Sequence, residues 1–282
     1  RRLPDRPDHR RGRWSPGAMS DADAPLAFGD VVIIGGGCYG TFYAGQMEKA
    51  RARGAVTYQQ LLVIDRDPAC QMIRELGETH DRRLVRSEWG DFLDEYLSPA
   101  ATDRDSFRAP PRPSGSSGPS QIVPSPLMPH LMYDWLLRRA RARWPGRAIE
   151  TRPLRSGPGT PYDVEAPDGT RYLSFADWLC PTHCIEPSLC PVTRAPRTWE
   201  MTDALQRWVE RRNHASATRG PVLFTCRHQA FGVGTFGVAE VLAGDSLVAG
   251  AGEEGAPVDV LVGTISACHG AASLMHLGAA AA

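Results

Sequence analysis

The chain has 282 residues, of which 42% are hydrophobic and 23% are charged, and its 32 basic residues balance its 32 acidic ones. This composition is typical of a globular protein of one or two domains and excludes global disorder. A net charge of zero argues against a protein whose main task is to bind nucleic acid, because that affinity depends on neutralising phosphates. Apolar runs such as residues 31–34 and 258–265 are far shorter than the roughly 18 residues that span a bilayer, so we expect no membrane insertion.

The first 18 residues are strongly basic, with six arginines against two aspartates. They contain no apolar periodicity and no apolar stretch of the kind that secretory signals carry. We therefore predict a disordered basic extension over residues 1–25 and a cytoplasmic location. In that compartment the seven cysteines of the chain would not form a disulfide scaffold.

Strands and helices alternate through the next part of the chain. Residues 30–34 (DVVII) and 61–64 (LLVI) are short apolar runs typical of buried strands, and residues 83–87 predict a third strand. The spacing of apolar residues predicts that helices follow these strands, at residues 39–53, 68–76 and 90–97. This alternation indicates an α/β fold with a parallel sheet and helices on both of its faces.

The remaining two thirds of the chain predict a mixed region. A proline- and serine-rich loop covers residues 98–130 and contains a further strand at residues 121–123, and an amphipathic helix follows at residues 127–144. Beyond it we expect short strands over residues 145–178, a helix that begins near Thr202, apolar runs at residues 222–224, 236–242 and 258–265, and a final helix around residues 270–277.

A glycine-rich loop follows the first strand directly. Gly35, Gly37 and Gly40 form a G-x-G-x-x-G pattern in which the first glycine permits a tight turn, the second lets the backbone approach a pyrophosphate, and the third lets helix and strand pack closely. The helix that begins here would point its unpaired N–H groups at the phosphates. Cys38 and Tyr39 lie inside the same loop, so we include both among the cofactor-binding residues.

This part of the chain, about residues 30–97, resembles the Rossmann-type NAD(P)-binding superfamily. The segments VVIIGGGCYG and LLVIDRDP carry the resemblance, and LVRSEWGDFLDEYL is similar to the third strand and acidic turn of such domains. The resemblance implies that the three glycines contact the pyrophosphate, that Asp65 binds the adenine ribose, and that Asp91 lies near the adenine. We accordingly divide the chain into the extension (1–25), a Rossmann-like dinucleotide-binding domain (26–145) and a mixed α/β region with a cysteine-rich loop (146–282).

The residues after the second strand bear on the choice of dinucleotide. Asp65 stands 25 residues after Gly40, where a carboxylate can accept hydrogen bonds from both ribose hydroxyls, which favours NAD. Arg66 beside it leaves room for the additional phosphate of NADP. FAD fits less well, because the acid at this position is usually glutamate in FAD-binding proteins.

A second chemical signal lies in the segment CPTHCIEPSLCP. Cys180, His183, Cys184 and Cys190 fall within eleven residues, and thiolates with imidazole are the usual ligands of zinc, while cysteines in proline-rich loops also hold iron–sulfur clusters. The ligand spacing matches neither the common zinc knuckle nor the ferredoxin pattern. An inert, buried loop and a reactive thiol with His183 as its base are the alternatives. Additional ligands could come from later in the chain: Cys226, His228, Cys268, His269 and His276.

These signals lead to three hypotheses about function. The first is an NAD(P)-dependent oxidoreductase that acts on a small-molecule substrate, with His183 as the candidate for proton transfer. The second is a non-catalytic NAD(H)-sensing protein, similar to TrkA-type domains. The third is a metal or iron–sulfur protein that uses residues 180–190.

Overall fold

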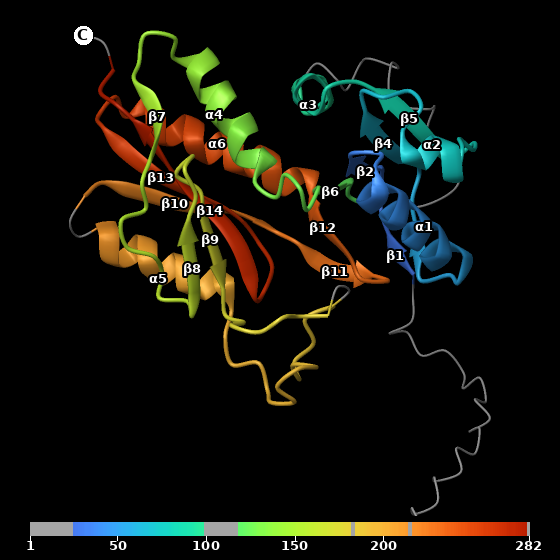
Figure 1. Ribbon diagram of the computed structural model, residues 1–282. Helices are drawn as coiled ribbons and strands as arrows, with labels where there is room; N and C mark the ends of the chain where they lie inside the picture. The colour runs from blue at the N-terminus through green and yellow to red at the C-terminus, as the bar shows by residue number, and fades with distance from the viewer. Residues whose placement is uncertain (1–24, 99–117, 182–183, 214–215, 281–282) are drawn as a thin grey trace, which may run out of the picture.

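The computed structural model describes residues 25–98, 118–181, 184–213 and 216–280 (Figure 1). The predicted basic extension lies outside these ranges except for Pro25. The described residues form a mixed α/β fold with six helices and three sheets, in which parallel and antiparallel strands both occur. No helix among them is long and apolar enough to cross a membrane.

The first sheet has six strands in the order β11-β12-β6-β2-β4-β5. Four of them are parallel, with β6 on one side of β2 and β4 and β5 on the other. Their carboxyl ends therefore lie along one edge of the sheet. The strand bounds are β2 (Val31–Ile34), β4 (Leu61–Asp65), β5 (Arg82–Arg86), β6 (Gln121–Val123), β11 (Arg227–Ala230) and β12 (Val233–Gly237).

Helices cover both faces of this sheet, because the side chains of each buried strand alternate between them. Val31 and Ile33 face the side of α1 (Cys38–Ala52) and α2 (Gln71–Glu75). Val32 and Ile34 face the side of α3 (Trp89–Tyr96) and α4 (Leu131–Arg143). A small two-stranded parallel sheet lies beside the first sheet and pairs β1 (Leu26–Ala27) with β3 (Val56–Thr57).

The second sheet is mixed and runs β10-β13-β14-β9-β8, with β7 also paired to β14. One face is covered by α5 (Met201–Asn213) and the other by α4 and α6 (Val238–Glu253), as Figure 1 shows. A single buried cluster runs from Ile64 in the first sheet through Trp135 of α4 to Val262 in the second. The strand bounds are β7 (Ile149–Arg152), β8 (Tyr162–Glu165), β9 (Arg171–Ser174), β10 (Thr218–Thr225), β13 (Val258–Ile265) and β14 (His269–Leu277).

One sequence-based expectation about the C-terminal region is wrong. The helix expected around residues 270–277 is strand β14, which pairs with β13, β7 and β9 and is almost wholly buried. A strand buried on both faces shows no alternation, so its small and apolar residues read as helix.

Helix α6 was not predicted from the sequence. Its glycines weaken the helical signal, but two of them allow close packing. A side chain at Gly244 would meet Val222, and one at Gly252 would collide with the Trp144 ring.

The two predicted regions share the first sheet. Strands β11 and β12 come from beyond residue 145, and β12 pairs antiparallel with β6, which comes from before it. The hairpin β11–β12 also contacts α1, where Gln46 donates a hydrogen bond to the carbonyl of Phe231 at 3.2 Å. This junction brings the C-terminal half of the chain close to the glycine-rich loop.

Candidate functional site

The glycine-rich loop joins the end of β2 to the start of α1. Gly35 has a φ of +91°, which favours glycine. The N–H of Gly36 donates to Asp65 Oδ2 at 2.7 Å, so the end of β4 holds the loop in place. A Cβ atom on Gly40 would lie 1.7 Å from the carbonyl oxygen of Gly35, and therefore only glycine permits this contact between helix and loop.

Gly37 differs from Gly40 in having open space around it. A Cβ atom there would meet nothing within 4 Å. Gly37 is the N-cap residue of α1, and no side chain caps this helix end. The first N–H groups of α1 therefore point toward an open surface.

The other predicted dinucleotide residues lie near this loop or along the same edge of the sheet. Asp65 is partly buried, and its Oδ1 accepts a hydrogen bond from the N–H of Asp67 at 2.9 Å. Arg66 is exposed and pairs with Glu88 at 3.1 Å. Asp91 is exposed in the first turn of α3.

Cys38 and Tyr39 are exposed at the start of α1. The ring centroid of Tyr39 lies 6.4 Å from that of Tyr43, one helical turn further on. Tyr43 in turn lines a large cavity, so aromatic side chains connect the glycine-rich loop to that cavity.

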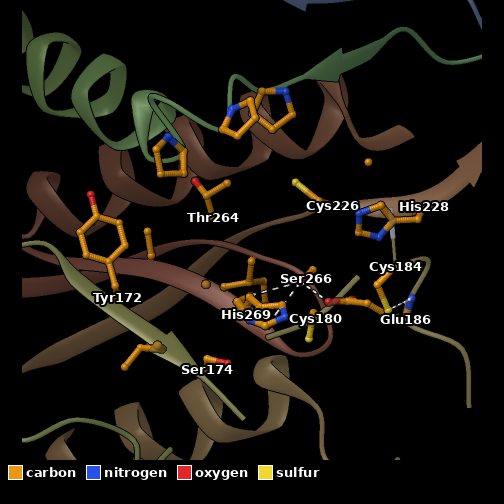
Figure 2. A pocket seen from close by; sticks show the side chains of 18 of the residues that line it. Tyr172, Ser174, Cys180, Cys184, Glu186, Cys226, His228, Thr264, Ser266 and His269 are labelled. Atoms are coloured by element: carbon orange, nitrogen blue, oxygen red, sulfur yellow. Dashed lines mark hydrogen bonds between the residues drawn. The ribbon is translucent and has the colours of Figure 1, made fainter. Parts of the chain in front are cut away.

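This main cavity has a volume of about 510 Å³ and lies between the two sheets. Its walls come from the residues that follow β6, from β11 and β12, from β9, β13 and β14, and from Cys180, Pro181, Cys184 and Glu186. In Figure 2, Cys226, His228, Cys184 and Glu186 gather at one end and Tyr172 lies at the other. The lining residues that carry polar or ionisable side chains are Tyr43, Ser125, Tyr162, Tyr172, Ser174, Cys180, Cys184, Glu186, Cys226, His228, Thr264, Ser266 and His269.

Burial alters the ionisation of several of these groups. It raises the pKa of the Cys226 thiol to about 12, so this cysteine is a neutral thiol. Burial, together with nearby His269, lowers the pKa of His228, although Glu186 acts in the opposite direction. The His228 ring lies close against Gly234, where an added Cβ would be 3.1 Å from Nε2. The cavity therefore presents a neutral imidazole at His228 and a neutral thiol at Cys226 at neutral pH.

Glu186 attaches the cysteine segment to the turn between β13 and β14. Its carboxylate accepts hydrogen bonds from the Ser266 hydroxyl at 2.6 Å and from the N–H groups of Ala267 at 2.7 Å and Cys268 at 3.3 Å. Glu186 also has a φ of +52°, which is uncommon outside glycine. The carboxylate therefore holds the wall of the main cavity against the second sheet.

The structure brings together part of the predicted metal set. Cys180 and Cys184 line the main cavity, and both also line a much smaller cavity with Cys190. His183, the candidate for both proton transfer and metal binding, lies outside the described residues. Among the described residues, no three Cys, His, Asp or Glu side chains are close enough to hold a metal ion together as they stand.

Four of the five additional candidate ligands lie at the cavities, and the fifth lies apart from them. Cys226, His228, Cys268 and His269 lie at the two cavities. His276 lies elsewhere in the second sheet, where its Nδ1 is 2.7 Å from the carboxylate of Asp259.

Glu186, Tyr43 and Thr264 line the main cavity but were not predicted from the sequence. The sequence shows a glutamate between two cysteines of a proline-rich segment. Its carboxylate, however, accepts hydrogen bonds from the N–H groups of a turn about 80 residues away. No local pattern reveals such a contact.

The C-terminal half of the chain is similar to one known protein family. A family described as "Uncharacterized protein, C-terminal domain" matches residues 132–278. No curated protein and no solved structure matches the chain. The matched residues include nearly all of α4, all of α6, the whole second sheet, the small cavity and part of the lining of the main cavity, and they make up more than half of the sequence. The chain therefore belongs to the family described as "Uncharacterized protein, C-terminal domain".

Proposed function

We propose that the chain is an NAD(P)-dependent oxidoreductase, with a Rossmann-type dinucleotide site at residues 35–40 and a substrate site in the main cavity. The position of the main cavity is the observation that carries this proposal. Strands β4 and β5 extend the sheet on one side of β2, and the chain then crosses to form β6 on the other side. In open α/β sheets, ligands bind at the carboxyl edge where the strand order reverses in this way.

Residues at this reversal belong to both parts of the proposed site. The glycine-rich loop follows β2, and Pro124 and Ser125, which line the main cavity, follow β6. A dinucleotide whose pyrophosphate lies over Gly37 would have its adenosine half toward Asp65. Its nicotinamide half would then extend past Tyr39 and Tyr43 toward the cavity. The volume of about 510 Å³ is within the range of small-molecule sites.

The residues of the loop have the features that this binding mode needs. The open space at Gly37 and the uncapped start of α1 offer N–H donors to a pyrophosphate. The Asp65 carboxylate keeps acceptor capacity beyond its two backbone hydrogen bonds, which suits ribose hydroxyls and supports NAD over NADP. Arg66 would have to leave Glu88 to bind a further phosphate.

When bound, the nicotinamide supplies the hydride acceptor or donor. The protein must position the substrate and exchange a proton with it. His228 is suited to that exchange, because its lowered pKa keeps the imidazole neutral and able to accept a proton. None of the described lining residues is lysine or arginine, which favours a substrate without a carboxylate or phosphate near its reacting carbon. A non-catalytic NAD(H) sensor would instead bind the dinucleotide without turning over any carbonyl or imine compound.

Filling the main cavity tests where the nicotinamide lies. We expect Ser125→Trp to weaken NADH binding about tenfold, which is about 1.4 kcal/mol, because the indole would occupy the space beyond β6. ADP-ribose lacks the nicotinamide and should bind as it does to the unmodified protein. Isothermal titration with both ligands measures the difference.

The matched control is Ser246→Trp, which adds the same ring to an exposed position on α6 and should leave both affinities unchanged. Equal weakening of NADH and ADP-ribose by Ser125→Trp would show that the nicotinamide half does not enter the cavity.

A further inference from the structure

Four cysteines from distant parts of the chain line one small cavity beside the main one. Cys180, Cys184 and Cys190 come from the cysteine segment, and Cys268 comes from the turn between β13 and β14. The cavity has a volume of only about 10 Å³, and Trp178 and Trp199 form part of its wall. It therefore has room for about one atom the size of a water molecule.

Hydrogen-bond donors surround these sulfur atoms. The indole N–H of Trp199 donates to Cys268 Sγ at 3.2 Å, and the N–H of Glu186 donates to Cys184 Sγ at 3.3 Å. Hydrogen bonds from the backbone and hydroxyl of Thr193 lower the pKa of the Cys190 thiol. Neutral thiols are weak acceptors, whereas metal-bound thiolates are commonly supported by such donors.

A further donor at this cavity lies beside a cysteine sulfur. The indole nitrogen of Trp178 is buried and makes no hydrogen bond of ordinary geometry within the described part of the chain, but its N–H interacts with the Cys180 sulfur and favours the thiolate there. Trp178 and Cys180 both line the small cavity. A thiolate at Cys180 is a stronger acceptor than the thiol and would complete this hydrogen bond.

Burial acts against ionisation of two of the four sulfurs in the absence of a cation. It raises the pKa of Cys180, and it raises that of Cys268 to about 11. A buried thiolate is favoured where a positive charge compensates it. A divalent thiophilic cation would supply that charge and would use the donors already in place.

We propose that Cys180, Cys184, Cys190 and Cys268 together bind one zinc ion. Four cysteines form a common set of ligands for structural zinc, with tetrahedral geometry. The size of the cavity favours a single ion over an iron–sulfur cluster, which contains several atoms. Because the four side chains do not yet converge at bonding distance, the binding requires side-chain rotations toward the cavity. Cys268 takes the place that the sequence analysis gave to His183.

The zinc ion would fasten the cysteine segment to the second sheet. Glu186 already makes this connection by its hydrogen bonds to the same turn. The two contacts together would fix Cys180 and Cys184 in the wall of the main cavity. This inference does not depend on dinucleotide binding.

Zinc analysis of the purified full-length protein tests the inference. We expect about one zinc per chain in the unmodified protein, and the loss of at least nine tenths of it in Cys268→Ser. Cys38→Ser changes an exposed cysteine far from the small cavity and should keep its zinc. Cys268→His retains a zinc ligand at the same place and should recover most of the metal.

The pH dependence provides a second readout of the same site. Zinc binds cysteine as the thiolate, so its binding at these four thiols releases protons. The affinity should therefore fall as the pH falls, and Cys268→Ser should reduce the number of protons released. Unchanged zinc content in Cys268→Ser, absence of zinc from the unmodified protein, or bound iron with acid-labile sulfide would each overturn the inference.

Discussion

Replacing Gly37 by aspartate is expected to abolish dinucleotide binding without destabilising the fold. Gly37 has φ and ψ values of −76° and −158°, which any residue can adopt, and an added Cβ meets nothing within 4 Å. Aspartate is a favourable N-cap residue, so α1 should gain a few tenths of a kcal/mol. The new carboxylate would, however, occupy the open surface where we place the pyrophosphate. Two like charges about 4 Å apart repel by about 4 kcal/mol at a protein surface, so the affinity should fall at least 100-fold.

The control for this substitution lies on the same helix. Gly45 is also in open space on α1, so Gly45→Asp adds the same charge two turns away from the loop. Fluorescence titration with NADH and thermal unfolding of both variants make the comparison. If Gly37→Asp binds NADH as tightly as Gly45→Asp does, the glycine-rich loop is not the pyrophosphate site.

The second large effect is expected from Glu186→Ala. The substitution leaves the N–H groups of Ala267 and Cys268 without their acceptor, and it leaves the Ser266 hydroxyl with only the carbonyl of His269 at 3.4 Å. Hydrogen bonds to charged groups are among the stronger ones, and unpaired donors that are partly buried add a further cost. We expect the free energy of unfolding to fall by about 3 kcal/mol.

Urea unfolding and hydrogen exchange measure this effect in complementary ways. The N–H groups of Ala267 and Cys268 should exchange much faster in Glu186→Ala than in the unmodified protein. Glu186→Gln keeps one acceptor oxygen and should lose only about half as much stability. Unchanged exchange at these two N–H groups would mean that Glu186 does not hold the cysteine segment to the second sheet.

Local patterns in the sequence predicted much of the first sheet. The strands at residues 31–34 and 61–65 are buried apolar runs, and the helix after the glycine-rich loop begins within one residue of its predicted start. These elements follow one another closely in the chain, so periodicity and glycine placement identify them. The wall of the main cavity could not be predicted in this way, because it forms only when β12 pairs with β6, more than 100 residues earlier in the chain.

The difference between local patterns and contacts of distant residues also explains the errors in the C-terminal half. Strand β14 and helix α6 both owe their conformation to tertiary contacts: β14 pairs with strands on both sides, and α6 places glycines against Trp144 and Val222. The cysteine segment was recognised from its composition, but its relation to Cys268 depends on the turn between β13 and β14. Residue type indicated the chemistry there, and only the fold shows which thiols lie together.

Titration of the unmodified full-length protein with NADH tests the central claim most directly. The proposed site predicts one NADH bound per chain, with weaker binding of NADPH because Asp65 stands where the additional phosphate would lie. ADP-ribose should compete with NADH, since it carries the pyrophosphate and both riboses. Absence of NADH binding at millimolar concentration, or binding that ADP-ribose does not displace, would contradict the dinucleotide site at residues 35–40.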